Sequence, residues 1–327
     1  MAGALEVADG AGGTGEADAG LAAARRGLRA AADLLIALSP FGQGERAGRL
    51  ETAERALVAA ATVSGDRFAE GRARFLLCGS HLAATRLDDA RTEALAAEAA
   101  SRSAGDTVML RQVLNDLGLI AQILHRNGEA IGRFEESVAL ARQLGHRSGA
   151  VASTVNSALS KVRRGQAAEA ATVCEQLLPE VRALGDTAGT AYTLYVLGLA
   201  LHGLGCYPQA AERFRECRAL AATAGRRERQ ALAGIRLADT LCALGRPEQA
   251  LTEAEFALAL TIETGAQRDQ GYALQTLGRV LADLRRPTES RDRLHEAHRI
   301  FERLGLPQAA EVTELLAELM TQPGRDT

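Results

Sequence analysis

Two side chains of this sequence, His202 and Asp239, are of the types that act together in acid and base catalysis. Histidine exchanges a proton close to neutral pH, and a neighbouring carboxylate orients its ring or stabilises the charged form. The repeat described below places His202 near the end of one helix and Asp239 on the equivalent helix of the next unit. We therefore treat these two residues as the candidate catalytic pair. No other residues of the sequence support an enzyme.

Patterns typical of metal or nucleotide chemistry are weak in this sequence. His295 and His298 flank a glutamate, but they are three residues apart and lack the His-Glu-x-x-His spacing of a zinc site. Lys161 is the single lysine, so the sequence has no Gly-x-x-x-x-Gly-Lys phosphate loop. We expect residues 295–298 to form a surface helix segment and the glycine-rich residues 10–15 to be a linker. The sequence thus predicts no metal and no cofactor, and it favours a non-catalytic protein over an enzyme.

The five cysteines include no Cys-x-x-Cys pair, and their odd number fits reduced thiols. Three of them, Cys78, Cys174 and Cys217, occupy repeat positions where other copies carry small or apolar residues. A free cysteine in such a place behaves as a small apolar side chain. We expect these three residues to pack in the core rather than to react.

A period of 40 residues organises the chain. Glycine recurs at this spacing without a slip of register across 240 residues. The glycines are Gly65, Gly105, Gly145, Gly185, Gly225, Gly265 and Gly305. A second series of small residues, from Ala90 to Ser290, keeps the same period, and a third series of Gly, Ala and Cys lies 12 residues upstream of it. Small residues at a fixed phase mark close contacts, so each unit is expected to contain two helices packed against each other.

One unit shows both of its helices clearly. Leu194, Leu197 and Leu201 fall on one face of a first helix. A Gly-Cys-Tyr-Pro cluster at 205–208 ends that helix, and a second apolar stripe through Phe214 follows. The periodic glycine then ends the second helix, because glycine adopts the left-handed conformation at no steric cost.

These phased residues resemble the tetratricopeptide repeat (TPR), in which a Leu-Gly pair in the first helix is followed by an alanine, an aromatic residue and a small residue in the second. Leu117-Gly118, Ala130, Phe134 and Ser137 fit that pattern in one copy. The first-helix tryptophan of the family is missing throughout, and the period exceeds the usual spacing of about 34 residues. Elongated repeats of this kind are similar to those in the sensor regions of large bacterial regulators, including those of actinomycetes, and in kinesin light chains.

The resemblance implies an all-α fold, a right-handed superhelical solenoid of antiparallel helix pairs. It is strong over residues 67–306 and weak over residues 21–66, and it divides the chain into five segments. They are a disordered N-terminal tail (1–20), a degenerate leading helical hairpin (21–66) with helices at about 21–38 and 44–64, six TPR-like 40-residue repeats (67–306), a C-terminal capping helix (307–320) and a tail (321–327). Because each unit buries its apolar face on its neighbours, one continuous array is expected.

In the TPR family the first helices line a concave groove, so the resemblance implies a ligand surface on their faces. Amide side chains there pair with a peptide backbone, arginines hold a carboxylate, and tyrosines combine apolar area with a polar tip. The candidate groove residues are Gln112, Asn115, Asp116, Gln122, Asn156, Tyr192, Tyr195, His202, Arg236, Asp239, Tyr272, Gln275 and Arg279. The tyrosines favour the C-terminal half as the ligand side. Two alternatives stay open: the polar residues form a solvated or internally paired face, and Tyr192 and Tyr272 pack between adjacent first helices.

The charge of the chain is nearly balanced, with 38 basic and 41 acidic residues. Residues 1–20 carry four acids and no base, so the folded part has a net charge of about +1, which favours neither nucleic acid nor an anionic membrane. The sequence has no apolar run of about 18 residues and no secretory signal. These features predict a cytoplasmic protein.

The favoured function is a non-catalytic scaffold whose concave groove binds a protein or peptide partner, with no direct binding to nucleic acid or membrane. The alternative is a regulatory sensor module that binds a small molecule or signalling peptide and acts on a separate transcription-regulating partner. An enzyme that uses the groove as a pocket around His202 and Asp239 is the third possibility. The sequence carries no signal of an oligomeric state.

Overall fold

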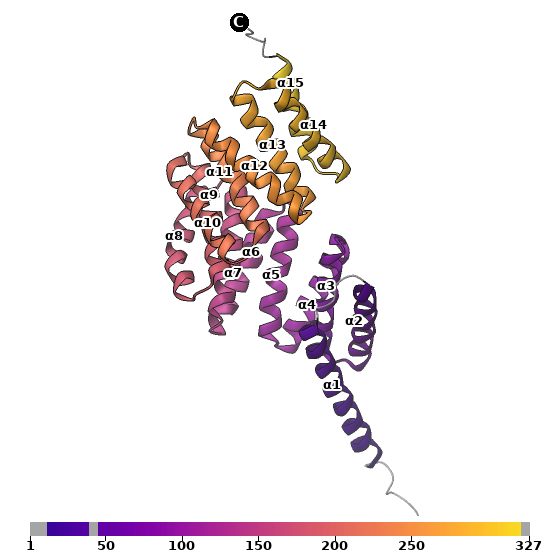
Figure 1. Ribbon diagram of the computed structural model, residues 1–327. Coiled ribbons are helices and arrows are strands. Elements are labelled where there is room, and N and C mark those ends of the chain that lie inside the picture. Colours follow the sequence, from indigo (N-terminus) through magenta and orange to yellow (C-terminus); the bar gives the residue numbers. More distant parts are fainter. Residues whose placement is uncertain (1–11, 39–44, 322–327) are drawn as a thin grey trace, which may run out of the picture. The chain divides into compact units, whose positions relative to one another are not determined.

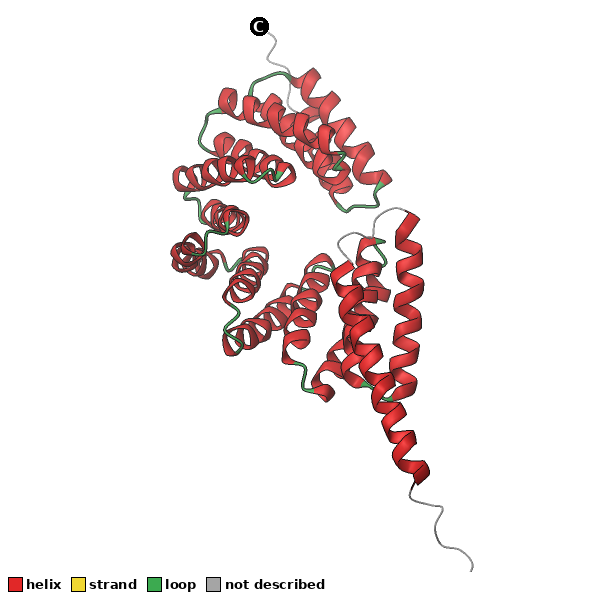
Figure 2. Ribbon diagram, turned by 60° about the horizontal axis from the view of Figure 1, so that its bottom comes forward, coloured by secondary structure: helices red, strands yellow, loops and turns green. Residues whose placement is uncertain are grey.

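The computed structural model describes residues 12–38 and 45–321, and every regular element in these ranges is an α-helix (Figures 1 and 2). The helices form two compact units, residues 1–153 (unit 1) and 154–327 (unit 2), and the boundary between them lies within helix α7 (Arg147–Arg163). Each unit has its own clusters of buried apolar side chains. The prediction of an all-α array of helix pairs is confirmed.

Unit 1 is built from helices that pack against their neighbours along the chain. They are α1 (Gly12–Leu38), α2 (Glu45–Ser64), α3 (Arg67–Ala83), α4 (Leu87–Ala104), α5 (Thr107–Ile123), α6 (Asn127–Gln143) and the first part of α7. Helices α2 to α5 each contact the next helix in sequence, and α3 also contacts α5. The odd-numbered helices from α3 to α13 are the first helices of the six predicted repeats.

Unit 2 continues the same pattern. Its helices are the rest of α7, α8 (Ala167–Ala183), α9 (Thr187–Gly203), α10 (Tyr207–Thr223), α11 (Arg227–Ala243), α12 (Pro247–Thr264), α13 (Gln267–Asp283), α14 (Pro287–Arg303) and α15 (Gln308–Thr321). From α8 to α15 each helix contacts the next one. The first helices α9, α11 and α13 also contact one another in order, so their side chains form one face.

The periodic glycines end the second helices, as the sequence predicts. Gly105 follows α4 with a φ of 69°, and Gly265 follows α12 with a φ of 67°. This left-handed conformation lets the backbone N–H of each glycine return to the last turn of its helix, where Gly105 donates to the carbonyl of Arg102. The conformation disfavours residues with a Cβ atom, which explains why glycine holds this position in every copy.

A second set of glycines lies where the two helices of a repeat cross. A Cβ atom on Gly118 would lie 2.5 Å from the ring of Phe134, and one on Gly198 would lie 2.6 Å from the ring of Phe214. Both phenylalanines are fully buried. The absence of a side chain on the first helix therefore makes room for the aromatic ring on the second, which is the close contact that the small-residue series predicts.

Cys78, Cys174 and Cys217 are buried, as expected for packing residues. Burial raises the pKa of each thiol to about 12. A thiol that is protonated at neutral pH is a poor nucleophile and a poor metal ligand. These three cysteines thus contribute apolar volume to the core.

The N-terminal helix begins earlier than the sequence suggests. The sequence predicts a tail up to residue 20, whereas α1 starts at Gly12. Once a helix has formed in the amphipathic residues that follow, each further residue adds one hydrogen bond, so the helix extends into the Gly- and Ala-rich stretch. Residues 1–11 and 322–327 of the two predicted tails lie outside the described residues, as does Gly44 at the expected start of the second helix.

Candidate functional site

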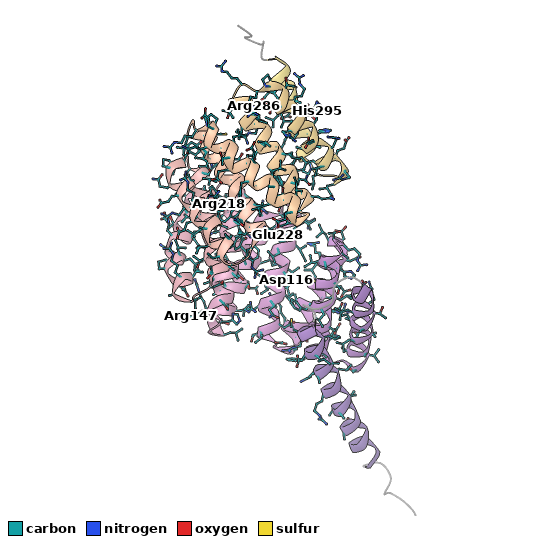
Figure 3. The ribbon with its side chains drawn as sticks, in the orientation of Figure 1. Asp116, Arg147, Arg218, Glu228, Arg286 and His295 are labelled. Atoms are coloured by element: carbon teal, nitrogen blue, oxygen red, sulfur yellow. The ribbon has the colours of Figure 1, made fainter. Side chains whose placement is uncertain are left out.

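The predicted groove residues lie on the first helices of both units. Unit 1 carries four of them on α5, and unit 2 carries the rest on α7, α9, α11 and α13. The segment 295–298, which superficially resembles a metal site, lies on the second helix α14 with His295 exposed (Figure 3). Among the described residues no group of three or more His, Cys, Asp or Glu side chains is arranged to hold a metal ion.

The α5 residues of unit 1 are largely used inside the protein. The Ser153 hydroxyl donates to Asn115 Oδ1 at 3.1 Å, and Asn115 Nδ2 lies 3.4 Å from Asp116 Oδ1. Gln122 is buried, and Gln112 is half-buried. Burial raises the pKa of Asp116 to about 6 despite its hydrogen bond from Asn115. This part of the predicted groove therefore fits the internally paired alternative.

Tyr192 connects two neighbouring first helices of unit 2. Its hydroxyl, on α9, donates to Asn156 Oδ1 on α7 at 2.9 Å. Burial raises the pKa of Tyr192 to about 12, so the phenol stays protonated and donates this hydrogen bond at neutral pH. Tyr192 thus packs between first helices, which is one of the two alternatives that the sequence leaves open.

Arg229, in the first turn of α11, lies on the rings of two tyrosines. Its guanidinium carbon is 4.5 Å from the ring centroid of Tyr192 and 4.9 Å from that of Tyr195. The Tyr195 ring is buried and is held edge-on by Phe214 at a centroid distance of 6.1 Å. Within the described part of the chain Arg229 forms no ion pair. Its charge is positioned by cation–π contacts, and its N–H donors are left for another partner.

Asp239 on α11 is surrounded by three donors. Its Oδ2 accepts from Arg236 Nη1 at 3.2 Å, while its Oδ1 accepts from Thr276 Oγ1 at 3.1 Å and lies 3.4 Å from Arg279 Nη1. The carboxylate side chain is 10% exposed, whereas the side chains of Arg236 and Arg279 are 38% and 50% exposed. Two partly exposed arginines therefore share one nearly buried carboxylate, and this cluster joins α11 to α13.

His202 and Asp239, the candidate catalytic pair, have other hydrogen-bond partners. Its Nδ1 lies 3.0 Å from Thr240 Oγ1, and that hydroxyl gives its only proton to the carbonyl of Arg236 at 2.7 Å. Nδ1 must therefore carry a proton and donate to Thr240. Burial lowers the pKa of His202, so the ring is held as the neutral Nδ1–H form. The two residues lie near each other, but both oxygens of the Asp239 carboxylate are engaged by other donors.

The remaining predicted residues lie on α13. Tyr272 packs edge-on against Phe301 of α14, with 5.2 Å between the ring centroids, and it borders the apolar cluster around Ile235 and Ala273. Its ring thus contributes to packing within the repeat and toward α11. Gln275 is half-buried on the same helix.

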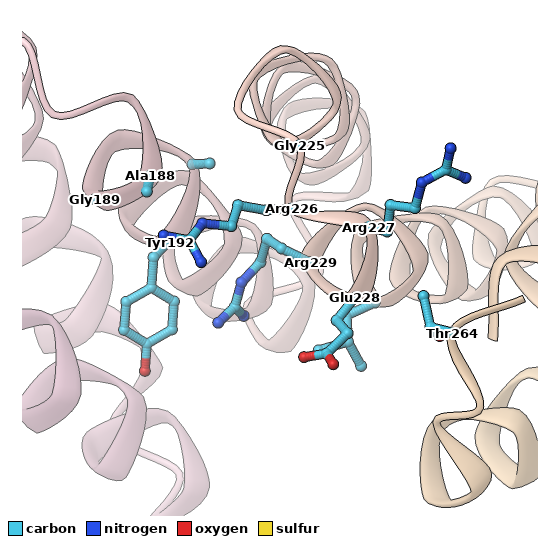
Figure 4. A pocket seen from close by; sticks show the side chains of 11 residues that line it. Ala188, Gly189, Tyr192, Gly225, Arg226, Arg227, Glu228, Arg229 and Thr264 are labelled. Atoms are coloured by element: carbon cyan, nitrogen blue, oxygen red, sulfur yellow. The ribbon is translucent and has the colours of Figure 1, made fainter. Parts of the chain in front are cut away.

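A cavity of about 680 Å³ lies between the first turns of α9 and α11. Tyr192 and Arg229 line it from opposite helices (Figure 4). Its other lining residues are Ala188, Gly189, Ala191, Gly225, Arg226, Arg227, Glu228, Leu232 and Thr264. Its volume is in the range of ordinary ligand sites. The pattern of first-helix faces predicts Tyr192 but none of the arginines that line this cavity, because Arg226, Arg227 and Arg229 lie at the very start of α11, before the positions that the pattern selects.

A signal in the sequence marks these turns. The residues after the first six periodic glycines, which precede the first helices of the repeats, are Asp66, Asp106, His146, Asp186, Arg226 and Ala266. The three aspartates and the histidine each accept a hydrogen bond from a backbone N–H in the first turn of the helix that follows. Arg226 and Ala266 make no such bond. An arginine in a series of capping residues distinguishes the start of α11 from the other first helices.

Comparison with known proteins places these features in context. No family model matches the sequence. The chain is 28% identical over 288 residues to regulatory protein AfsR of Streptomyces griseus, a match that covers 88% of this chain and 28% of AfsR. It is 32% identical over 175 residues to AfsR of Streptomyces coelicolor, covering 53% of this chain and 18% of that protein. The chain therefore spans less than a third of the length of the curated relatives it matches.

Solved structures with the same arrangement of helices are more distant in sequence. A Rap protein in complex with competence and sporulation factor has a TM-score of 0.62 at 12% identity, with 91% of this chain and 98% of that chain covered. The apo quorum sensor NprR of B. thuringiensis has a TM-score of 0.61 at 16% identity, covering 84% and 83%. A signal transduction ATPase of Pyrococcus horikoshii with a tetratricopeptide repeat sensor has a TM-score of 0.61 at 14% identity, covering 84% and 41%.

The chain has the fold of these tetratricopeptide-repeat structures. Its repeats are elongated to 40 residues, and they are similar to a region of an actinomycete regulator, as the sequence predicts. Within the described residues of this TPR array, no helix is long and apolar enough to cross a membrane.

Proposed function

We propose that the chain is a non-catalytic binding module whose first-helix face in unit 2 holds a peptide segment of a partner. The observation that carries this proposal is a row of polar contacts across four successive first helices. Asn156 on α7 bonds Tyr192 on α9, and Tyr192 carries Arg229 of α11 on its ring. Further along α11, Asp239 bonds Thr276 on α13.

This row has the properties of a prepared binding face. The side chains are fixed by contacts with one another, so a peptide does not have to immobilise them on binding, which lowers the entropic cost of association. Arg236 and Arg279 remain partly exposed although they share one carboxylate. The aromatic rings provide apolar area beside these donors. An extended peptide, with its alternating backbone donors and acceptors, matches such a surface.

A regulatory sensor is the second candidate, and the likeness to AfsR over 88% of this chain favours it. The solved relatives include a Rap protein bound to competence and sporulation factor and the quorum sensor NprR. In this role the ligand is a signalling peptide or a small molecule, and its binding changes how the chain acts on a transcription-regulating partner. Both candidates use the same face of unit 2.

An enzymatic role finds no support in the geometry around His202. Its Nδ1 proton is committed to Thr240, and Asp239 is held by two arginines and a threonine. A general base needs an oriented partner and access to the proton that it removes. We therefore do not propose catalysis for His202 and Asp239.

Selection from a random peptide library tests the proposed function. The protein is panned against peptides displayed on phage, and the selected peptides are labelled and titrated by fluorescence anisotropy. Replacing Arg236 and Arg279 together by alanine is expected to weaken binding by about tenfold or more, because charge-assisted hydrogen bonds are lost. Arg279→Ala alone, at the more exposed position, is expected to give a smaller loss in the same direction.

The double variant Arg286→Ala, Arg293→Ala is the matched control. It removes the same charge at the second helix α14, where Arg286, directly before the helix, pairs with Glu289 and Arg293 pairs with Glu296. Thermal melts establish that all variants fold. A library that yields no binding peptide, or equal affinity for the two double variants, contradicts the proposal.

A further inference from the structure

We propose that a groove along the second helices α12 and α14 holds an amphipathic helix of a partner protein, with acidic residues at one end of that helix. This groove lies on second helices, whereas the proposed peptide face lies on first helices. The two surfaces are therefore independent of each other. The groove arises because α12 and α14 lack the ion pairs that join other neighbouring second helices.

Arginine–glutamate pairs join neighbouring second helices elsewhere in both units. In unit 1, Arg133 of α6 donates to Glu98 of α4 at 2.8 Å, and Arg102 of α4 bonds Glu136 of α6. The equivalent positions carry ion pairs in unit 2, where α8, α10 and α12 are joined by Arg182–Glu216 and Arg218–Glu253. Each of these pairs spans the groove between two second helices.

Helix α12 cannot form such pairs with α14. Leu258 and Ile262 stand at the two positions where α4 carries a glutamate and an arginine. The partner positions on α14 keep their charges as Arg293 and Glu296, which bond each other at 3.1 Å. Among the described residues, no ion pair joins α12 to α14. The groove between these two helices is therefore left without a charged bridge across it.

Two neighbouring cavities, of about 270 and 340 Å³, follow α14. Arg293 lines the first and Glu296 the second, and we call the surface that the two cavities form the α12–α14 groove. Leucines of α13 line both cavities, and Leu258 and Ile262 line the first. Ile262 is 59% exposed. A contiguous apolar surface of this kind, bordered by charged residues, is typical of a site that a partner covers.

The walls of the groove favour a helical occupant. They are helices whose backbone groups are paired internally, so an extended peptide finds no strand edge to bond, whereas a helix satisfies its own backbone. The lining residues of α13 run from Gln270 to Leu281, a length of about 16 Å at 1.5 Å per residue. The groove thus matches about three turns of a partner helix.

The charges along the groove give the occupant a direction. Arg299 and Arg303 line the second cavity, and neither forms an ion pair within the described residues. In the first cavity, Arg286 and Arg293 are each paired with a glutamate, while Glu255 forms no ion pair within the same residues. We therefore expect acidic residues on the partner helix at the Arg299 and Arg303 end, and a basic residue at the other end.

Selection from a library of amphipathic helices tests this proposal. Each member is a helix of about five turns with a fixed leucine stripe, and its flanking positions vary among Glu, Gln and Lys. The selected helices are titrated by fluorescence anisotropy and are expected to carry glutamates at one end. The Leu258→Glu, Ile262→Arg variant restores the residues found on α4, so Arg293 and Glu296 gain partners across the groove. It should weaken binding by about tenfold or more.

Two further variants keep the test specific. Val63→Arg adds an arginine at an apolar side chain of α2 that is 90% exposed, and it should leave binding unchanged. The Arg299→Glu, Arg303→Glu variant should weaken binding by about tenfold, and replacing the glutamates of the selected helix by lysine should restore it. Thermal melts establish that all variants fold.

Several outcomes would overturn the partner helix. They are a library without binders, equal binding to the Leu258→Glu, Ile262→Arg variant, and unchanged binding after a proline is placed in the middle of a selected helix. Sedimentation that shows a dimer of the unmodified protein and a monomer of the same variant would assign the groove to a second copy of this chain instead. The Arg236→Ala, Arg279→Ala variant should bind the helices normally, so failure of the proposed function is distinguishable from failure of the groove.

Discussion

At the scale of single residues, polar side chains on the first helices fall into two groups. Asn115 and Asp116 in unit 1 bond within the protein, and burial shifts the carboxyl of Asp116 toward its neutral form. Arg229 and Arg279 in unit 2 keep donors available although they are held by neighbours. All four lie on first helices, which belong to three different repeats. The difference arises from the neighbouring helix, which the sequence pattern does not place.

Replacing Asp116 by asparagine tests the environment of this carboxyl. The pKa of Asp116 is raised to about 6, above its value of about 3.9 in an unfolded chain. Folding therefore favours the protonated form, and the wild-type protein loses stability as pH rises from about 4 through about 6. The asparagine side chain cannot ionise, so we expect Asp116→Asn to be more stable than wild type by on the order of 2 kcal/mol at pH 8, with little difference at pH 4.

Urea denaturation at the two pH values measures this effect. Asp292→Asn on α14 is the control, since Asp292 is exposed and its replacement should alter the unfolding free energy by less than about 0.5 kcal/mol at either pH. A gain in stability for Asp116→Asn that is the same at pH 4 and pH 8 would show that the carboxyl is not the cause.

At the scale of helices, size complementarity within each repeat explains the alternation of glycine with larger residues. Where the first helix has glycine at the crossing, the second has Phe134, Phe214 or Leu294. Where the first helix has Ala238, the equivalent residue of the second is Ala254, and Cys78 is likewise matched by a small residue. At each crossing, a glycine on the first helix is thus matched by a large side chain on the second, and a larger residue on the first helix is matched by a small one on the second.

Gly198→Ala tests this division of volume. The added Cβ would lie 2.6 Å from the Phe214 ring, so we expect a loss of about 1–3 kcal/mol of unfolding free energy from overpacking. Phe214→Ala alone should cost about 3–5 kcal/mol through the cavity that it leaves. In the double variant the new methyl group partly fills that cavity, so the two losses should sum to more than the double variant shows. Additive losses in a double-mutant cycle would exclude the proposed complementarity.

The positions of the helices can be predicted from the sequence far more completely than the side-chain contacts of the candidate site. The start and end of a helix depend on features that lie close together in the sequence, such as the periodic glycine and the apolar stripe. These features therefore specify where α3 to α14 begin and end. The hydrogen-bond partners of Tyr192 and Asp239 lie 36 and 37 residues away in the sequence, on neighbouring first helices. These contacts depend on how adjacent repeats are oriented relative to each other. Arg229 lies outside the face that helix phase selects, and only the interruption of the capping series marks it.

At the scale of the molecule, the polar row links helices that belong to different repeats. Asn156 and Tyr192 join one pair of repeats, and Asp239 and Thr276 join another. A ligand that binds along this row contacts several repeats at once, and its binding energy favours the arrangement of repeats in which all contacts are made together. The sensor candidate depends on this property, whereas a rigid scaffold does not need it.

Solution X-ray scattering separates these two candidates. If the chain is a sensor, a saturating amount of a peptide from the library selection should change the radius of gyration, because repeats move relative to one another on binding. The Arg236→Ala, Arg279→Ala variant should show no change at the same peptide concentration. Superimposable scattering profiles of the unmodified protein with and without bound peptide would favour the scaffold.

The glycine and phenylalanine at each helix crossing have a consequence for how such an array grows. Gly198 and Phe214 lie only 16 residues apart, inside one 40-residue unit. A tandem duplication of the coding segment for that unit copies both residues, so the new unit arrives with its internal contact already matched. Mutation then has to adjust only the junctions with the neighbours, and the number of units is free to change while the period stays fixed.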